Sequence, residues 1–505
     1  MKTNIRRLLA FLAVAALCVS AVGCSSGKEG VSSQTSSTVT ADNAESGLLT
    51  SETSSVADIG DGDLLTPETS SNAISSQKPS STSSKKYNEG QIDNTDYLGN
   101  GSTKQEKLFG NLRGTTLYIS ESDNWFTQNL MKQFEKKYGV KVVNRAYSFA
   151  EEQTKLATMV QAGDKKNYLD TATMSQVVAL RYIYNGLVMP MDKYIDTNEA
   201  GWNIRGSSEK RYTPYIIDGK IYGSASNSYP EMAIFYNKTY MQEKGIKDPY
   251  KDYYLKNNWN FDTFLQVAKD CKAMSANGKT VKTYGVTTWD YFSFCLAAGN
   301  TVIEQEKDGN WKVTVDDANG MAGLNLIYEL YKAGTFGDTC TNADFLQRKV
   351  AMIIGTATNV MGGTDAYEVM SDEVGYVPFP KKTNSSPLYI PICPDGRAIA
   401  ACSQNPAAAA AWIYEFQHAE EVRDNSDYGL ANRRKFLSDE HLAIRNKLAK
   451  EGKMIWTSVD GLTNWYGVNR TKFIDIISKQ GKAPASAVEQ MLPLLNDSLQ
   501  RLLDK

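Results

Sequence analysis

Histidine and paired cysteines are scarce in this chain of 505 residues. Its two histidines, His418 and His441, lie in predicted C-terminal surface helices. No HExxH, GxSxG or CxxC motif occurs, and the five cysteines after position 24 are an odd number. A metal site, a disulfide framework and a serine-hydrolase site are therefore not expected, and we predict no cofactor and no enzyme activity. Cys393 and Cys402 stay open as a pair across a bend or as free thiols.

An excess of charge of one sign is also lacking, since 55 basic residues face 57 acidic ones. The net charge of −2 gives no electrostatic basis for binding nucleic acid. After the first residues, no segment is apolar enough to cross a membrane. The composition, 41% hydrophobic, is that of a globular protein, and the length exceeds what one core usually holds. Carboxylates are plentiful, so a glycosidase-like acid pair stays open as an alternative.

The first residues have the order of an export signal. A basic start, Lys2 to Arg7, precedes a short apolar run from Leu8 to Val19, and "AVGCSSG" then places small residues before Cys24. This stretch resembles the lipobox of bacterial lipoproteins. The resemblance implies a signal peptide over 1–23, acylation of Cys24 and a lipid anchor at the extracytoplasmic face of the bacterial cell membrane. A plain secretory signal with an incidental cysteine is the alternative.

A low-complexity segment follows Cys24. Stretches such as "SSQTSSTVT" and "SSQKPSSTSSKK" are rich in serine and threonine and nearly free of aromatic residues. Such a segment buries too little apolar area to offset its ordering entropy. We therefore predict a flexible tether over 24–110, with the folded part beginning near Asn111.

From Asn111 onward, strands and helices alternate. The β-branched run "TTLYIS" is followed by a helical pattern with apolar residues at Trp125, Phe126, Leu130 and Phe134, and "VKVVNRAY" then resumes a strand. This β–α–β order with short joints predicts a parallel sheet and an α/β fold. From Pro406 onward the patterns are almost all helical.

Three stretches in order carry a family resemblance. They are "NGLVMPMDKYID" at 185–196, "IDGKIYGSASNSYPEMAIFYNK" at 217–238 and "FLQRKVAMIIGTATNV" at 345–360. Together, behind a lipobox and a Ser/Thr-rich tether, they resemble bacterial extracellular solute-binding proteins, the substrate-capturing subunits of ABC importers. Within that group the chain is similar to the sugar-binding type that includes maltose-binding protein.

The resemblance implies a two-lobed periplasmic-binding-protein-like fold with discontinuous lobes and a ligand cleft between them. Mapped onto this sequence, lobe one comprises 111–231 plus 351–397, and lobe two comprises 232–350 plus 398–505. The implied function is capture of a small solute, a sugar or oligosaccharide, by a monomer that delivers it to ABC permease subunits. A ligand sensor of the same fold and a secreted glycoside-acting enzyme are the alternatives.

Polar cleft candidates come from two places. Asp123 and Asn124 follow the first strand, where α/β folds bind ligands, although both are also good N-caps. Glu231 stands at the head of the apolar run "MAIFYNK", and a buried carboxylate there needs a polar partner. The resemblance places Glu231 and Asn227 at the first crossover between lobes, with Glu231 accepting hydrogen bonds from ligand hydroxyls. The alternative is that Glu231 is solvated or pairs with a lysine such as Lys238.

The remaining candidates lie in the second half of the chain. Trp289 and Tyr291 follow a strand where the family presents a ring to the sugar, and core packing is the alternative for them. Trp465 lies in the polar, Gly-flanked loop "GLTNWYGVN", which makes pure core burial less natural. The family places an aromatic platform in this region. Arg397, in the turn "CPDGR", is a candidate for binding a ligand carboxylate or hydroxyl.

Overall fold

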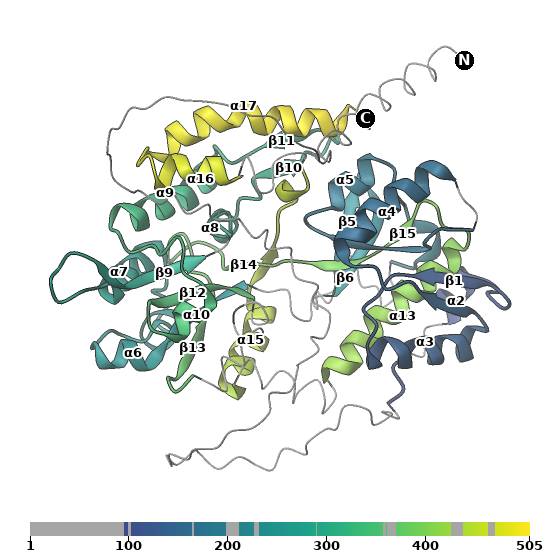
Figure 1. The fold of residues 1–505 in the computed structure, drawn as a ribbon, viewed down its shortest axis with the longest axis horizontal. Coiled ribbons are helices and arrows are strands. Elements are labelled where there is room, and N and C mark those ends of the chain that lie inside the picture. Colours follow the sequence, from purple (N-terminus) through teal and green to yellow (C-terminus); the bar gives the residue numbers. More distant parts are fainter. Residues whose placement is uncertain are drawn as a thin grey trace, which may run out of the picture. The chain divides into compact units, whose positions relative to one another are not determined.

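The computed structural model describes ten stretches of the chain, all between Asp58 and Lys505. It contains two five-stranded sheets, which lie in opposite halves of Figure 1 with helices packed around each. The described residues are 95–98, 103–163, 166–197, 212–226, 232–288, 290–356, 360, 370–425, 438–462 and 470–504.

The first sheet has the strand order β3-β15-β6-β5, with β4 also paired to β15, and all of these pairings are antiparallel. A parallel ladder of β1 and β2 lies beside it, and the N–H of Asp170 donates to the carbonyl of Tyr118 at 2.8 Å. The parallel β1–α3–β2 unit confirms the predicted β–α–β order. The strands are β1 (Thr116–Ile119), β2 (Lys141–Asn144), β3 (Thr171–Ser175), β4 (Val188–Met189), β5 (Tyr212–Ile217), β6 (Lys220–Ser226) and β15 (Asp395–Ala400).

The helices around the first sheet are dominated by α13, which packs against β15, β6, α2 and α3. Its alanine run, Ala408–Ala411, is fully buried, so the helix backbone can approach the sheet closely. Trp412 follows that run and packs edge-on against Phe134 of α3. The elements are α2 (Thr103–Phe109), α3 (Trp125–Tyr138), α4 (Phe149–Ala162), α5 (Ala179–Tyr184), the 3-10 turn η1 (Asp192–Tyr194) and α13 (Pro406–Asn425).

The second sheet has the order β13-β7-β12-β9-β8. Its central strand β12 runs parallel to β9 and antiparallel to β7. Both β7 and β12 are buried along their whole length, which explains why they read as continuous apolar runs rather than alternating ones. The strands are β7 (Met232–Asn237), β8 (Ala273–Met274), β9 (Val281–Thr288), β12 (Val350–Thr356) and β13 (Val374–Val377).

Helices and two short ladders complete the second half. The hairpin β10–β11 packs against α17, and β14 lies parallel to β16 beside α8. The ladder strands are β10 (Ile303–Gln305), β11 (Trp311–Val313), β14 (Tyr389–Pro391) and β16 (Lys453–Ile455). The helices are α6 (Lys238–Glu243), the π-helical turn η2 (Pro249–Tyr254), α7 (Phe261–Cys271), α8 (Ser293–Ala298), α9 (Ala318–Lys332), α10 (Asn342–Leu346), α15 (Asp439–Glu451), the 3-10 turn η3 (Val459–Gly461), α16 (Arg470–Ser478) and α17 (Pro484–Leu503).

Strand pairing corrects the predicted division between lobes. The prediction assigned 351–397 to lobe one, yet β12 and β13 pair with β7 in the second sheet. It assigned 398–505 to lobe two, yet α13 packs on the first sheet. Among the described residues, lobe one therefore holds 95–226 and 395–425, and lobe two holds 232–391 and 438–504. Both lobes are discontinuous, as predicted, but the chain returns to lobe one at β15 rather than at β12.

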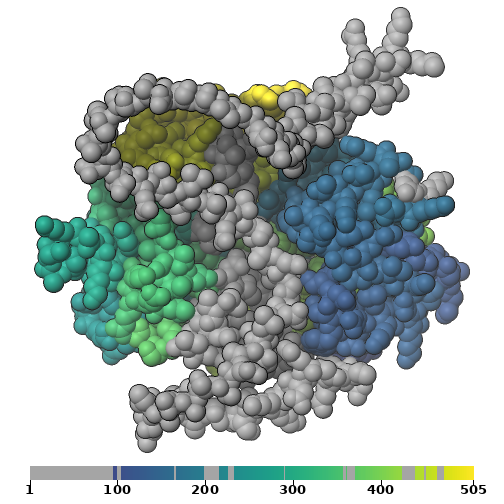
Figure 2. All heavy atoms as spheres, viewed as in Figure 1, coloured from purple at the N-terminus to yellow at the C-terminus, as the bar shows by residue number. Residues whose placement is uncertain are grey.

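The predicted limit of the tether at residue 110 is also wrong. Tyr97 is fully buried against Phe126, and its N–H donates to Gln133 Oε1 at 2.9 Å. Gln105 of α2 is fully buried, donates to the carbonyl of Tyr194 and accepts from the N–H of Asp196. We call 95–98 together with 103–109 the clasp. In the space-filling view, the first part of the described chain, which starts with the clasp, is coloured dark blue (Figure 2).

Burial also corrects the histidine prediction. His441 is 3% exposed rather than on a surface, and its Nε2 lies 2.9 Å from the carbonyl oxygen of Val374. The five cysteines after position 24 are all free thiols, so Cys393 and Cys402 do not form a pair. Within the ranges described, no helix has the length and apolarity needed to cross a membrane, and no group of His, Cys, Asp and Glu is arranged to hold a metal ion.

Candidate functional site

The loop after β1 carries two of the predicted cleft residues. Asn124 is the N-cap of α3, because its Oδ1 accepts the N–H of Thr127 at 2.9 Å. Asp123 is exposed, and its Oδ1 accepts from Nε2 of Gln128 at 3.1 Å. Asp123 also lines a surface hollow of about 360 Å³ beside α3 and the end of β2. The capping alternative therefore holds for Asn124, while Asp123 faces an open hollow.

Arg397, another predicted cleft residue, is bound to a carboxylate of its own chain. Its Nε and Nη2 donate to Oε1 and Oε2 of Glu121 at 2.6 and 2.7 Å. The guanidinium also lies 3.5 Å from the ring centre of Phe416, and Trp412 Nε1 donates to Glu121 Oε1 at 3.3 Å. The Arg397 and Glu121 side chains are largely buried, with 18% and 6% of their surface exposed. This bidentate pair joins β15 to the end of β1.

A second carboxylate, Glu152 of α4, lies next to this pair. It is 1% exposed and accepts hydrogen bonds from the N–H and the hydroxyl of Thr173. Thr173 is directly opposite Arg397 in the β3–β15 register. Burial raises the pKa of the Glu152 carboxyl to about 7 and the charge of Glu121 adds to the rise, although the Thr173 hydrogen bonds oppose it. Glu152 thus gains its charge near neutral pH.

The raised pKa of Glu152 makes stability depend on pH. Between its unfolded value near 4.5 and about 7, the folded protein binds the extra proton, so this contribution to stability is full below about pH 4.5 and is lost as pH rises through 7. The parent is therefore expected to lose about 2.5 kcal/mol of unfolding free energy between pH 5 and pH 8 through this group, a loss that Glu152→Gln should not show. Urea titrations at several pH values measure this, and a pH-independent difference would contradict it.

His441 provides an internal check of opposite sign. Burial lowers the pKa of its imidazole to about 4. Because the unfolded chain then binds more protons between pH 4 and 6.5, stability from His441 is lost as pH falls through that range. The two contributions offset each other in the parent below pH 6.5. For this reason the Glu152 effect has to be taken as a difference between variant and parent.

Tyr291, the predicted stacking residue after β9, is half-buried against Phe336, with ring centres 5.9 Å apart. Its hydroxyl donates to Oδ1 of Asp338 at 2.8 Å, and the hydroxyl of Tyr331 donates to the same oxygen. Asp338 itself is exposed. The ring therefore packs on its own lobe and its hydroxyl helps to orient an exposed carboxylate. The predicted residues Asn227, Glu231, Trp289, Trp465 and Cys24 lie outside the described residues.

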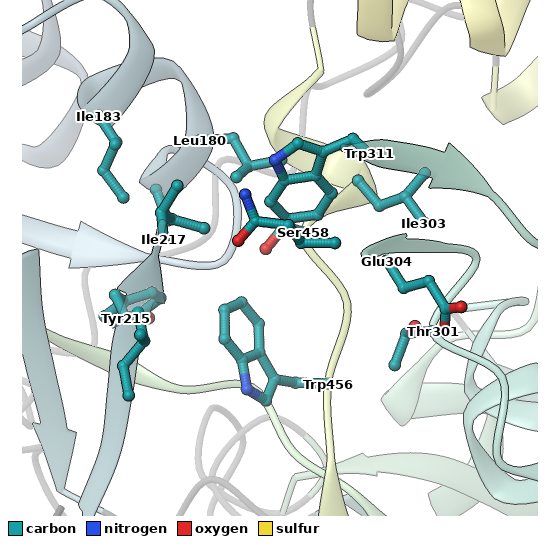
Figure 3. A pocket seen from close by; sticks show the side chains of 13 residues that line it. Leu180, Ile183, Tyr215, Ile217, Thr301, Ile303, Glu304, Trp311, Trp456 and Ser458 are labelled. Atoms are coloured by element: carbon teal, nitrogen blue, oxygen red, sulfur yellow. The ribbon is translucent and has the colours of Figure 1, made fainter. Parts of the chain in front are cut away.

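The structure also contains a cavity that the sequence reasoning missed. It has a volume of about 220 Å³, and the indole rings of Trp311 and Trp456 lie above and below it in Figure 3. Its lining comes from α5, β5, the β10–β11 hairpin and the segment before η3. The lining residues are Ala179, Leu180, Ile183, Tyr215, Ile216, Ile217, Thr301, Ile303, Glu304, Gln305, Trp311, Trp456 and Ser458.

The chain can now be compared with known proteins. A model of the family described as bacterial extracellular solute-binding protein matches residues 119–417, which is more than half of the chain. The chain belongs to this family. The match confirms the family predicted for this solute-binding protein, which is a family of binding proteins. A search of curated proteins found no match.

Solved structures share the fold at low sequence identity. UgpB from Mycobacterium tuberculosis, in complex with glycerophosphocholine, has a TM-score of 0.55 and 13% identity over 76% of this chain and 98% of its own. Lmo0181 from Listeria monocytogenes, in complex with cycloalternan, has a TM-score of 0.53 and 15% identity over 76% and 98%. A galacto-N-biose-/lacto-N-biose I-binding protein from Bifidobacterium longum, in complex with lacto-N-biose, has a TM-score of 0.53 and 15% identity over 77% of this chain and 96% of its own. These likenesses confirm the predicted two-lobed fold.

Proposed function

We propose that this solute-binding protein captures a sugar or oligosaccharide between its lobes and delivers it to an ABC importer without changing its bonds. The family match spans strands of both sheets. Each lobe presents a candidate side chain shortly after a strand, Asp123 after β1 and Tyr291 after β9, and this placement carries the proposal. A solute held from both lobes favours their closed arrangement. The cycloalternan and lacto-N-biose of two structural neighbours support a carbohydrate.

The proposed ligand contacts divide by chemistry. Carboxylate and amide groups meet ligand hydroxyls, and aromatic rings meet the apolar C–H faces of a pyranose. Because Arg397 already holds Glu121 with two of its N–H groups and its Nη1 lies 4.0 Å from Glu420, its part in binding is to position the loop that carries Glu121. The proposed set is Asp123, Asn124, Asn227, Glu231, Trp289, Tyr291, Trp465 and Arg397.

We further propose that the protein acts as a monomer anchored by acyl chains on Cys24, at the extracytoplasmic face of the membrane. The motif "AVGC" supports this anchor, because two or more acyl chains hold a protein stably to a bilayer. Membrane fractionation of Cys24→Ala tests it. Retention of that variant in the membrane fraction would overturn the anchor.

Loss of the Trp465 ring is expected to weaken sugar binding about 10-fold or more, because a stacking face is removed. Calorimetry against the sugar that gives the largest thermal shift in a panel measures this effect. Trp456→Ala is the matched control, since Trp456 lines the cavity beside Trp311 and is not in the proposed set, and it should leave sugar affinity unchanged. An unaltered affinity in Trp465→Ala would contradict the stacking role.

Small-angle scattering tests the closure itself. The radius of gyration is expected to fall when the protein is saturated with the sugar found in the panel. Chromatography of the recovered sugar accompanies this measurement. No compaction with any member of the panel, or the release of a cleaved product, would overturn the proposed function.

A further inference from the structure

The cavity between Trp311 and Trp456 is lined by other residues than those proposed for the solute site. None of its lining residues belongs to the set proposed above for the sugar. Its walls come from both lobes, with α5 and β5 on one side and the β10–β11 hairpin on the other (Figure 3). An occupant would therefore touch both lobes at once.

The aromatic walls of the cavity are held in place by hydrogen bonds and ring contacts. Nε1 of Trp311 donates to the hydroxyl of Tyr184 at 2.6 Å. Tyr215 is 1% exposed, and its hydroxyl donates to the carbonyl of Pro394 at 2.6 Å. The Tyr215 ring meets Trp456 edge to face, with centres 5.2 Å apart. A ligand would thus meet ring surfaces that are already oriented.

The polar groups of the cavity are few, and two of them have partners. Glu304 forms an ion pair with Lys312 at 2.9 Å. Gln305 donates to Asp218 at 2.6 Å, a contact that also joins the two lobes. The hydroxyls of Thr301 and Ser458 complete the polar lining. A sugar carries hydroxyls around its whole rim, and this lining is too apolar to satisfy them.

The volume of the cavity further limits the kind of ligand that it can hold. The cavity, at about 220 Å³, is larger than the ~150 Å³ apolar cavity that binds benzene and smaller than the roughly 300 Å³ at which drug-sized sites begin. One six-membered ring with a single polar substituent fits this range. Ile216, at the rim, is a large apolar residue that is 37% exposed, so the lining reaches solvent.

We propose that this cavity is a second binding site, for a small single-ring aromatic or alicyclic molecule carrying one hydroxyl or N–H group. The ring lies between the indoles of Trp311 and Trp456, and the polar group is directed to the Ser458 and Thr301 hydroxyls. The proposal does not require that the other site binds a sugar. It is tested on the solute-free protein, so its failure and that of the proposed function are distinguishable.

Phenol, indole and cyclohexanol serve as probes, with glucose as the polar control. Calorimetry and ligand-detected NMR on the full chain are expected to show saturable phenol binding with a Kd of about 1 mM or tighter. Trp456→Ala is expected to weaken it about 10-fold or more. Trp465→Ala, in the proposed sugar set, is the matched control and should leave phenol binding unchanged.

A second measurement covers the case in which Trp456→Ala does not fold. With 5-fluorotryptophan in the parent protein, phenol is expected to shift the fluorine resonances of Trp311 and Trp456. Shifts confined to other tryptophans would overturn the proposal, as would no saturable binding up to 10 mM (about tenfold the expected Kd). Displacement of phenol by glucose at these two resonances would overturn the assigned ligand class.

Discussion

Replacing Arg397 by alanine is expected to lower the free energy of unfolding by about 3 kcal/mol, because it leaves the carboxylate of Glu121 buried without its cation. Only 6% of the Glu121 side chain is exposed, and the Trp412 N–H, at 3.3 Å, is a weak replacement for two charged donors. The stacking of the guanidinium on Phe416 is lost as well. Urea unfolding monitored by circular dichroism measures the loss.

Arg501→Ala is the matched control for this experiment. Arg501 pairs with Asp497 at 2.8 Å, but both side chains are more than half exposed, so its loss should cost less than about 1 kcal/mol. The double variant Glu121→Gln/Arg397→Ala should lose less than the sum of its two single variants, because no buried charge is left unpaired. Equal losses in Arg397→Ala and Arg501→Ala would show that the Glu121–Arg397 pair has no special weight.

The clasp is the second place where a single change is expected to have a large effect. Tyr97→Ala and Phe109→Ala should each lower the unfolding free energy by about 3–5 kcal/mol, since both rings are buried to at least 97%. Tyr97 packs against Phe126, and Phe109 packs against Tyr138 and Tyr414. Their loss opens cavities beside α3 and α13, on which lobe one depends. Thermal and urea unfolding measure both changes.

The neighbouring Leu108 supplies the control, because it is 38% exposed in the same helix. Leu108→Ala should cost less than about 1 kcal/mol. A chain starting at residue 111 is expected to unfold at a lower temperature than one starting at residue 95, because only the latter retains the clasp. If the two chains unfolded at the same temperature, the clasp would be a passive extension and the boundary near Asn111 would stand.

The sequence was most informative where local chemistry decides the structure. Helix α3 begins after its N-cap Asn124 and ends at its C-cap Gly139, whose φ of 67° suits glycine. Both capping residues can be recognised in the sequence. Strand β1 was recognised from its β-branched content. The family followed from the order of such pieces, because order is retained where identity has fallen to 13–15%.

Long-range partners could not be read from the sequence. The run that becomes β12 is apolar on both faces, so nothing in it says which sheet it joins, and it was assigned to the wrong lobe. The partner of Arg397, Glu121, lies 276 residues away in the sequence, so their ion pair could not be predicted. Tyr97 belongs to a segment poor in aromatic residues, which concealed its buried position. The Trp311–Trp456 cavity combines four separate elements, none of which is distinctive by itself.

The clasp also determines how mechanical force enters this molecule. A pulling force applied upstream of Thr95 is passed to α3 by the two hydrogen bonds between the Gln133 side chain and the backbone of Thr95 and Tyr97. Lobe one therefore bears the load, because Thr95, Tyr97 and Gln133 all belong to it. A solute-binding protein pulled from this end would take the force first into lobe one, through α3.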